Sequence, residues 1–456
     1  MEGRLWAGTA KVDITPPLTI PYLGYVPRQA RFEGVHDPLH ARALVLDDGR
    51  QQVALVTADS IGYSHAILGP GRHFREEVCR QVERRTGISP ERVMVAASHA
   101  HSTPETLNIT DLLEVPQALG WLEDLTGRLA GAAAAAQQAL QPARIKAGRG
   151  RAEGIAANRR QLLRDGRFYQ PAHGAPPSPV VRPGRVDEEV GVVLVEFEDG
   201  TCSVLANFAC HPVTVQVQPL VSADYPGVAC SLVEQTVPGC RHCLFTQGAD
   251  GDLNPRRGDT RDFGDVSRYG QILGGEIMKV VAGLGFVEVE AGEPVLGAAI
   301  AEVLLPGRDL PSPEPFRQAA ARERAAAEKA EDSGARFAAL NQARGAEEAL
   351  RTIAMGAGPV QTLVQVLRLG GVALVGCPGE LFVELGLEIK QQAVAPFPFV
   401  VGYANDYVGY LSTPAAFEEG GYETSLGPWC LVGPEGGRRV VDAGLSLVRR
   451  LWMERG

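Results

Sequence analysis

Short apolar runs recur along this chain, and each of them ends in a polar or ionisable residue. The segment Val53–Thr57 (VALVT) leads to Asp59, and Val93–Ala97 (VMVAA) leads to His99. Short runs of this kind, bounded by polar residues, are typical of buried β-strands. Loops at strand ends often bring side chains from distant segments together, so these ends are where we expect a site. The residues that follow the runs are Asp59, His99, His101, His211, Asp250, Asp252 and Glu380.

Turn signals and periodicity predict further strands and helices. Asp199-Gly200, between 190–198 and 202–209, predicts a β-hairpin, and Gly370-Gly371, between 364–369 and 372–376, predicts another. A late strand is expected at 399–402. We expect helices over 74–85 and 123–141, after Glu380, and within 438–456. The proline-rich segment 170–184 is expected to be a loop.

Residues 313–352 are rich in Ala, Glu and Arg and predict a helical hairpin with charged, solvent-facing sides. The chain contains neither an internal repeat nor a clear linker. The expected fold class is therefore α+β (mixed α/β), with mixed β-sheets surrounded by helices. We expect one domain over residues 1–456, decorated by the hairpin near 313–352.

Composition and charge exclude several classes of function. The formal net charge of −10 is spread along the chain, which argues against nucleic acid as the main partner. No run reaches the ~18 uncharged apolar residues of a membrane-spanning helix, so stable membrane insertion is not expected. The first residues (MEGRLWAGTAKVDITPP) lack the apolar core of a signal peptide. We therefore expect a cytoplasmic protein that acts on a small molecule.

The eight cysteines lie mostly in apolar runs and are expected to be reduced, buried thiols. Cys240-Arg-His-Cys243 is a single C-x-x-C motif. A structural zinc site needs a second pair of ligands, and no other pair is spaced for it. We interpret the motif as an ordinary strand entry, with a redox or metal role as the less favoured alternative.

The two histidines of SHAH are two positions apart, and side chains alternate along an extended segment. His99 and His101 are then expected on the same side, where both can bind a metal or one can bind while the other transfers protons. His211 can add a nitrogen and Glu380 an oxygen. Two histidines and a carboxylate with an open position are the donor set of catalytic zinc hydrolases. Each residue alone is more often a hydrogen-bonded strand-end residue, so both interpretations stay open at this point.

Five stretches, in order and over nearly the whole chain, are similar to those of a known family. They are AGTAKVDITPP with LGY, VHDPLHARALVL with VALVTAD, SHAHSTPE, NFACHPVTV through FTQGADGDLNP, and CPGELFVELG with YANDYVGYLSTPAAFEEGGYE. Each match is short, but five in order are specific. The chain resembles the catalytic domain of the neutral/alkaline (non-lysosomal) ceramidases, in the form of their shorter bacterial relatives. The resemblance implies a zinc-dependent amidase that splits an N-acyl bond.

The resemblance also implies roles for particular residues. The implied metal ligands are His99, His211, Glu380 and Tyr410. His101 is then a catalytic residue rather than a ligand, Tyr422 contacts the substrate carbonyl oxygen, and Arg159 lies in the pocket. Without the resemblance, the two tyrosines are best explained as packing or turn residues of a Gly-rich loop. For Arg159, a place on the surface is an equally good explanation.

The implied chemistry is coherent. Zinc lowers the pKa of bound water to about 7, and the resulting hydroxide attacks a carbonyl. The metal, Tyr422 and His101 then stabilise the oxyanion, and His101 can protonate the leaving amine. The phenol of Tyr410 ionises only because a cation favours its charged form. Carboxylates that fix imidazole tautomers are expected near the ligands, although capping of turns explains them as well; these are Asp59, Asp224 and Asp252.

The chain departs from the family at one notable position. Gly248 stands where the family has a serine, so no hydroxyl is available there to contact a polar headgroup. We also expect no counterpart of the family's C-terminal immunoglobulin-like domain. We therefore expect a small, soluble N-acyl substrate rather than ceramide in a bilayer. The alternatives are a metal-dependent hydrolase of an ester, lactone or phosphate ester, and a non-catalytic binding relative of the ceramidases.

Overall fold

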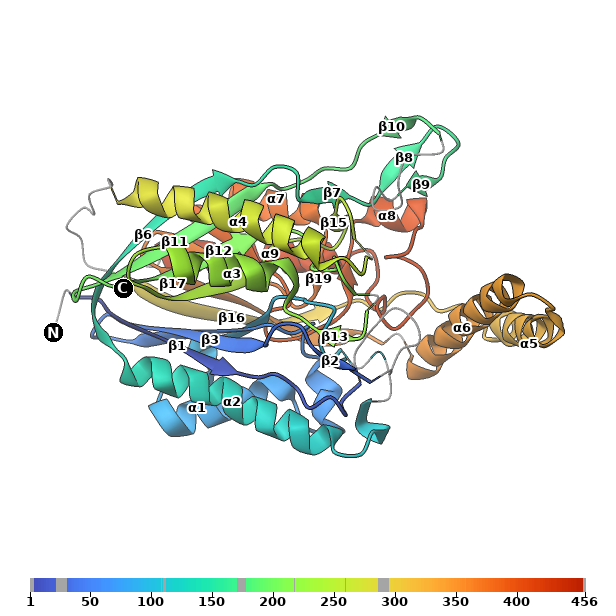
Figure 1. Ribbon diagram of the computed structural model, residues 1–456, viewed down its shortest axis with the longest axis horizontal. Helices are drawn as coiled ribbons and strands as arrows, with labels where there is room; N and C mark the ends of the chain where they lie inside the picture. The colour runs from blue at the N-terminus through green and yellow to red at the C-terminus, as the bar shows by residue number, and fades with distance from the viewer. Residues whose placement is uncertain are drawn as a thin grey trace.

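The computed structural model describes residues 4–21, 31–107, 109, 112–169, 178–216, 218–258, 260–285, 295–356 and 358–453. Two β-sheets lie at the centre of the molecule (Figure 1). The larger sheet has the spatial order β14 (Cys240–Gln247), β12 (Cys202–Phe208), β11 (Glu189–Phe197), β6 (Gln141–Arg151), β1 (Trp6–Asp13), β3 (His40–Asp47), β4 (Gln52–Ala58) and β5 (Val93–Ala97). The smaller sheet has the order β16 (Leu296–Leu305), β17 (Val360–Leu369), β18 (Val372–Gly376) and β20 (Phe397–Val401).

The two sheets pack face to face, because alternate residues of each strand point to opposite sides. On β3, Leu44 and Leu46 join a core cluster that also contains Leu374 and Phe399 of the smaller sheet. Ala43 of the same strand points the other way, into a cluster shared with helices. The pairing is mixed: β4 with β5, β12 with β14 and β18 with β20 are parallel, whereas the β1, β3 and β11 pairs are antiparallel.

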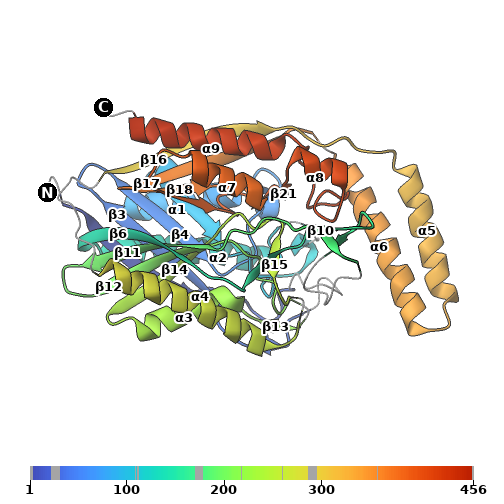
Figure 2. The ribbon, with the colours of Figure 1, turned by 90° about the horizontal axis from the view of Figure 1, so that it is seen from above.

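Helices cover the outer faces of both sheets (Figure 2). On the larger sheet, α1 (Phe74–Thr86) and α2 (Ala118–Gln138) pack beside β1, β3 and β4, and α3 (Asp224–Thr236) and α4 (Phe263–Leu284) pack beside β11, β12 and β14. On the smaller sheet lie α7 (Val383–Gln392) and α9 (Gly436–Met453). The order of layers is helix, sheet, sheet, helix, so the expected fold class is confirmed. Among the described residues, none of the helices combines the length and apolarity needed to cross a membrane.

A helical hairpin projects from one end of the layers, as both views show (Figures 1 and 2). It consists of α5 (Glu314–Lys329) and α6 (Ser333–Met355), as the composition of 313–352 predicts. The two helices contact each other through small buried side chains, among them Ala320, Ala327 and Ala343. Arg351 near the end of α6 donates a hydrogen bond of 3.3 Å to the carbonyl oxygen of Ile109, which ties the hairpin to the segment after the SHAH motif.

Most expected elements are present within a few residues of their expected bounds. The segment 170–184 is an exception: Val180–Arg182 forms β10, which pairs with β8 (Gln161–Leu163), and β8 also pairs with β9 (Phe168–Tyr169). Residues 170–177 of the expected loop lie outside the described residues. Strand β6 was not expected, since QPARIKAGRGR carries several charges. Its strand conformation follows from pairing with β11 along nearly its whole length.

Short strand pairs near one end of the layers complete the fold. They are β2 (Gly34–Val35) with β13 (Leu220–Val221), β7 (Ala156–Asn158) with β15 (Leu253–Pro255), and β19 (Glu380–Leu381) with β21 (Tyr410–Leu411). The last pair is followed by α8 (Pro414–Glu419). These short pairs hold the loops that carry the ionisable residues singled out from the sequence.

Candidate functional site

His99 follows β5 and is almost completely buried. Its backbone leaves the extended conformation, with φ of 66°, a value that residues other than glycine rarely adopt. The backbone N–H donates to the carbonyl oxygen of Ser60 at 2.8 Å, and Nδ1 lies 2.6 Å from the carbonyl oxygen of Ile61. The ring stacks on Tyr403 with centroids 3.9 Å apart. Because a carbonyl oxygen only accepts hydrogen bonds, Nδ1 carries the proton and Nε2 presents a lone pair.

His211 follows β12 and has the same protonation pattern. Its Nδ1 lies 2.8 Å from the carbonyl oxygen of Asp250 and 3.0 Å from that of Leu253. Nε2 therefore has a lone pair, and it faces the carboxylate oxygen Oε2 of Glu380 at 3.0 Å. Burial, and then the nearby guanidinium of Arg159, lower the pKa of His211 to about 3, so the ring is neutral.

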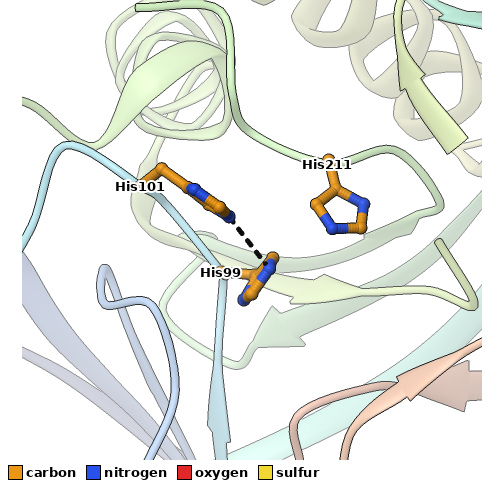
Figure 3. A group of neighbouring side chains, drawn as sticks. All are labelled: His99, His101 and His211. Atoms are coloured by element: carbon orange, nitrogen blue, oxygen red, sulfur yellow. Dashed lines mark hydrogen bonds between the residues drawn. The ribbon is translucent and has the colours of Figure 1, made fainter. Parts of the chain in front are cut away.

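His101 lies beside His99 with its ring nearly perpendicular, at 88° (Figure 3). The two Nε2 atoms are 3.1 Å apart, so the N–H of His101 Nε2 donates to the lone pair of His99. The expected proximity of the two rings is thus present, but strand alternation is not its cause, because the left-handed backbone at His99 lies between β5 and His101. The backbone N–H of His101 also donates to Pro212 at 3.2 Å, which joins the two histidine-bearing loops.

Glu380 and Tyr410 are brought together by strand register. They are directly paired in the parallel strands β19 and β21. Oε2 of Glu380 points to His211 and lies 3.9 Å from Nε2 of His99, and Oε1 accepts a hydrogen bond of 2.6 Å from the hydroxyl of Tyr407. Both oxygens of the carboxylate are therefore oriented, one by a tyrosine and one toward the histidines.

Arg159 hydrogen bonds to the hydroxyl of Tyr410 and to side-chain oxygen atoms of two other residues. Its guanidinium donates to that hydroxyl at 2.8 Å, to Oδ1 of Asn254 at 3.0 Å and to Oε1 of Glu423 at 2.7 Å. Glu423 also accepts from Arg160 at 2.8 Å through its other oxygen. Burial raises the pKa of Tyr410, whereas the charge of Arg159 acts in the opposite direction and favours the phenolate.

Tyr422 lies at the edge of this group and is about half exposed (52%). Its ring stacks on Trp429 with centroids 5.1 Å apart and meets the ring of Tyr410 at 6.0 Å. Arg159 lies over the ring of Tyr422 at 5.8 Å. Of the residues implied by the resemblance, Tyr422 is the one that faces solvent, as a residue that contacts substrate must.

The donor atoms fit a bound cation. One nitrogen each of His99, His101 and His211 lie within 4.8 Å of one another, and among the described residues no other group of three or more His, Cys, Asp or Glu side chains converges in this way. The lone pair of His211 Nε2 and the Oε2 atom of Glu380 face each other at 3.0 Å, and Nε2 of His99 lies 3.9 Å from the same oxygen. A cation among these three atoms would replace repulsion between lone pairs by attraction. Nitrogen and oxygen donors of this kind are the ligands that Zn²⁺ takes in catalytic sites.

The three aspartates expected near the imidazoles contact other groups. Asp59 accepts from Arg42 at 2.9 and 3.0 Å, and Asp224 accepts from the backbone N–H of Thr214 at 2.9 Å. Asp252 accepts from Asn158 at 2.6 Å and from the backbone N–H of Val383 at 2.8 Å. They hold the loops that carry the ligands, while carbonyl oxygens of Ile61, Asp250 and Leu253 fix the tautomers.

Two residues of the site were missed by the sequence reasoning. Tyr407 lies within YANDYVGY, three positions before Tyr410, and Glu423 directly follows Tyr422. The sequence did contain a signal for a residue such as Glu423. If the adjacent arginines Arg159 and Arg160 are buried, their charges need a buried carboxylate as a partner. For Tyr407 we find no signal beyond its place in a tyrosine-rich loop.

Gly248 has a packing explanation. A Cβ atom on Gly248 would lie 2.7 Å from Cβ of Ala209, because the ends of β14 and β12 approach each other closely there. A serine at this position therefore requires the two strands to separate. Glycine at this position permits the close approach of the two strands.

Comparisons with known proteins agree with this fold. Residues 6–262, more than half of the chain, match the family model of the neutral/alkaline non-lysosomal ceramidase N-terminal region. The neutral ceramidase of Mycobacterium tuberculosis is 24% identical over 472 aligned positions, which cover 89% of this chain and 71% of that protein. The crystal structure of neutral ceramidase from Pseudomonas aeruginosa matches with a TM-score of 0.70 at 18% identity, over 99% of this chain and 75% of that chain. A solved ceramidase complexed with C2 matches with a TM-score of 0.72.

Proposed function

The chain belongs to the neutral/alkaline non-lysosomal ceramidase family, and on that premise we propose that it is a zinc-dependent hydrolase of the C–N bond in a small, soluble N-acyl amide. The observation that carries the proposal is the convergence of two neutral imidazole nitrogens, Nε2 of His99 and of His211, with the carboxylate of Glu380. Tyr410, paired with Glu380 in register, is the fourth proposed ligand. Zinc held by these residues supplies hydroxide near neutral pH and polarises the substrate carbonyl.

The remaining residues of the site bind, orient and move protons. The Nε2–H of His101 donates to Nε2 of His99. A metal on that nitrogen would end this hydrogen bond, and a protonated His101 beside it could then donate a proton to the leaving amine. Tyr422, at the exposed edge, donates a hydrogen bond to the carbonyl oxygen. Arg159 would neutralise the phenolate that Tyr410 forms when it binds the metal, and Glu423 keeps Arg159 in place through an ion pair of 2.7 Å.

The first test is metal analysis of the purified protein together with a substrate panel. We expect about one zinc per chain and loss of hydrolysis after treatment with 1,10-phenanthroline, followed by recovery on addition of zinc. The panel contains N-acetyl amino acids, simple amides and a short-chain ceramide in detergent. Release of amine from the N-acetyl amino acids supports the proposal as stated.

Other outcomes separate the alternatives. Cleavage of the short-chain ceramide alone keeps the amidase and overturns the small soluble substrate. Hydrolysis of a phosphate ester with magnesium or manganese, and without zinc, overturns the amidase. No hydrolysis of any member by zinc-loaded protein identifies a binding relative.

A further inference from the structure

A second group of reactive side chains lies at the opposite end of β12 and β14, where these strands begin. Cys202 is the first residue of β12, Cys240 is the first residue of β14, and the two are directly paired in the parallel register. Paired residues of neighbouring strands point to the same face and lie about 4.8 Å apart at Cα. That spacing falls within the range of about 4.4–6.8 Å in which a disulfide closes.

An irregularity in the strand explains why both cysteines of the C-x-x-C motif point to the same side. Between the pairs Cys202–Cys240 and Val204–Cys243, β14 has one residue more than β12. The extra residue turns Cys243 to the face that Cys240 already occupies, toward α3. Without it, residues 240 and 243 would point to opposite faces of the sheet.

The four thiols on this face form two pairs. Cys240 is paired with Cys202 in the strand register, and Cys243 packs in the same core cluster as Cys230 of α3. They are not one ligand cluster, since the only described group of three or more metal-capable residues that converges is the histidine group. The motif therefore divides between two partners, and neither pair consists of Cys240 and Cys243.

The two pairs differ in their access to solvent. All eight cysteines of the chain lie among the described residues, and Cys240 is the only one of them that is not buried. Cys202 is at the margin, with 9% exposure, whereas Cys230 and Cys243 are fully covered. A small oxidant therefore reaches the Cys202–Cys240 pair first.

From this geometry we infer that Cys202 and Cys240 form a reversible disulfide when the protein meets a peroxide. This modification site is independent of the hydrolase site, since it lies at the other end of the strands that lead to His211 and Asp250. The neighbouring thiol of Cys240 lowers the pKa of Cys202, which favours Cys202 as the attacking thiolate.

The chemistry balances in two steps. The sulfur of Cys202 attacks one oxygen of hydrogen peroxide, the O–O bond breaks, and a sulfenic acid and water form. The thiol of Cys240 then attacks the sulfenic sulfur, an S–S bond forms, and a second water leaves. Two thiols are oxidised and one peroxide is reduced. Dithiothreitol reverses the reaction by thiol–disulfide exchange.

Peptide mapping tests the inference with unusual clarity, because the sequence around the motif separates its two cysteines. Digestion with trypsin and Glu-C together places Cys240 in peptide 235–241 and Cys243 in peptide 242–256. The folded protein is treated with hydrogen peroxide, free thiols are blocked with N-ethylmaleimide in denaturant, and the digest is analysed by mass spectrometry. We expect peptide 235–241 linked to the peptide that starts at Asp199, with fragment ions that place the bond on Cys202.

Variants provide the controls. Cys202→Ser is expected to abolish the linked peptide, whereas Cys243→Ser is expected to retain it. Should Cys202→Ser fold poorly, Cys202→Ala serves the same purpose. The inference is overturned if Cys240 remains fully alkylated after oxidation, if it is linked to Cys243, or if the link joins two chains. A raised Tm of the oxidised protein, reversed by dithiothreitol, is the second readout.

Discussion

The candidate metal centre and the α5–α6 hairpin differ in the kind of contact that stabilises them. In the metal centre, nearly every buried polar group contacts a residue distant in the sequence: His99 contacts Ile61, and His211 contacts Glu380. In the hairpin, the two helices contact each other through alanines, and its ion pairs, such as Arg324 with Glu347, are exposed.

This difference teaches where a substitution should matter. Removing one partner in the metal centre leaves a buried donor, acceptor or charge unsatisfied, which costs the full desolvation of that group. Removing a side chain from the exposed face of the hairpin leaves its neighbours in water. We therefore expect substitutions in the metal centre to reduce stability or activity far more than substitutions on the exposed face of the hairpin.

The largest effect is expected for His99→Ala. It removes a ligand nitrogen, so the variant should lose the bound metal and reduce hydrolysis by roughly three orders of magnitude or more. The matched variant is His101→Ala, which removes a proton donor that is not a ligand. It should keep the metal and lose about 10²–10⁴-fold in kcat. Metal analysis and steady-state kinetics of both variants decide this, and a His99→Ala protein that is active without zinc contradicts it.

A smaller but still large effect is expected for Glu423→Gln. The change leaves Arg159 and Arg160 without their shared buried carboxylate, although the shape is retained. Breaking a buried ion pair by removing one partner costs about 3–5 kcal/mol, and we expect the free energy of unfolding to fall accordingly. Chemical denaturation measures it. The exposed Glu347→Gln in the hairpin is the control, since it should change stability by less than about 0.5 kcal/mol.

Tyr407→Phe probes the orientation of Glu380 alone. The phenylalanine fills the same space but no longer donates to Oε1 of the carboxylate. Residues that orient a ligand typically contribute about 10–100-fold to metal affinity or activity. We expect a loss within that range, measured by competition with a chelator. Unchanged affinity would mean that the register of β19 and β21 orients Glu380 without help.

The smallest effect is expected for Phe337→Ala on the hairpin. The side chain is 55% exposed, so its loss should change the free energy of unfolding by at most about 0.5 kcal/mol and leave kcat/KM for the N-acyl substrate unaltered. A marked loss of activity would contradict this expectation, because it would show that the hairpin takes part in the reaction. Thermal melts and kinetics of the same preparation measure both.

Much of the fold could be read from local pattern, while the site could be read only in part. The buried strand Val93–Ala97 and the hairpin around Asp199-Gly200 follow from short-range signals, and both are present. The pairing of Glu380 with Tyr410 depends on the register of two short strands about thirty residues apart, which no local signal specifies. The partner of Cys240 depends equally on one extra residue in β14.

The left-handed conformation of His99 has a consequence for the binding and release of the proposed metal ion. Tyr403, whose ring stacks on that of His99, and Asn405, which hydrogen bonds to Val95 of β5, also have positive φ values of 52° and 68°. Such conformations cost about 1–3 kcal/mol each and persist only where the surrounding structure enforces them. The direction of the ligand is therefore set by the main chain and not by the cation. We expect metal exchange to be a simple binding equilibrium on a rigid frame, so that stripped protein reloads at once and without refolding.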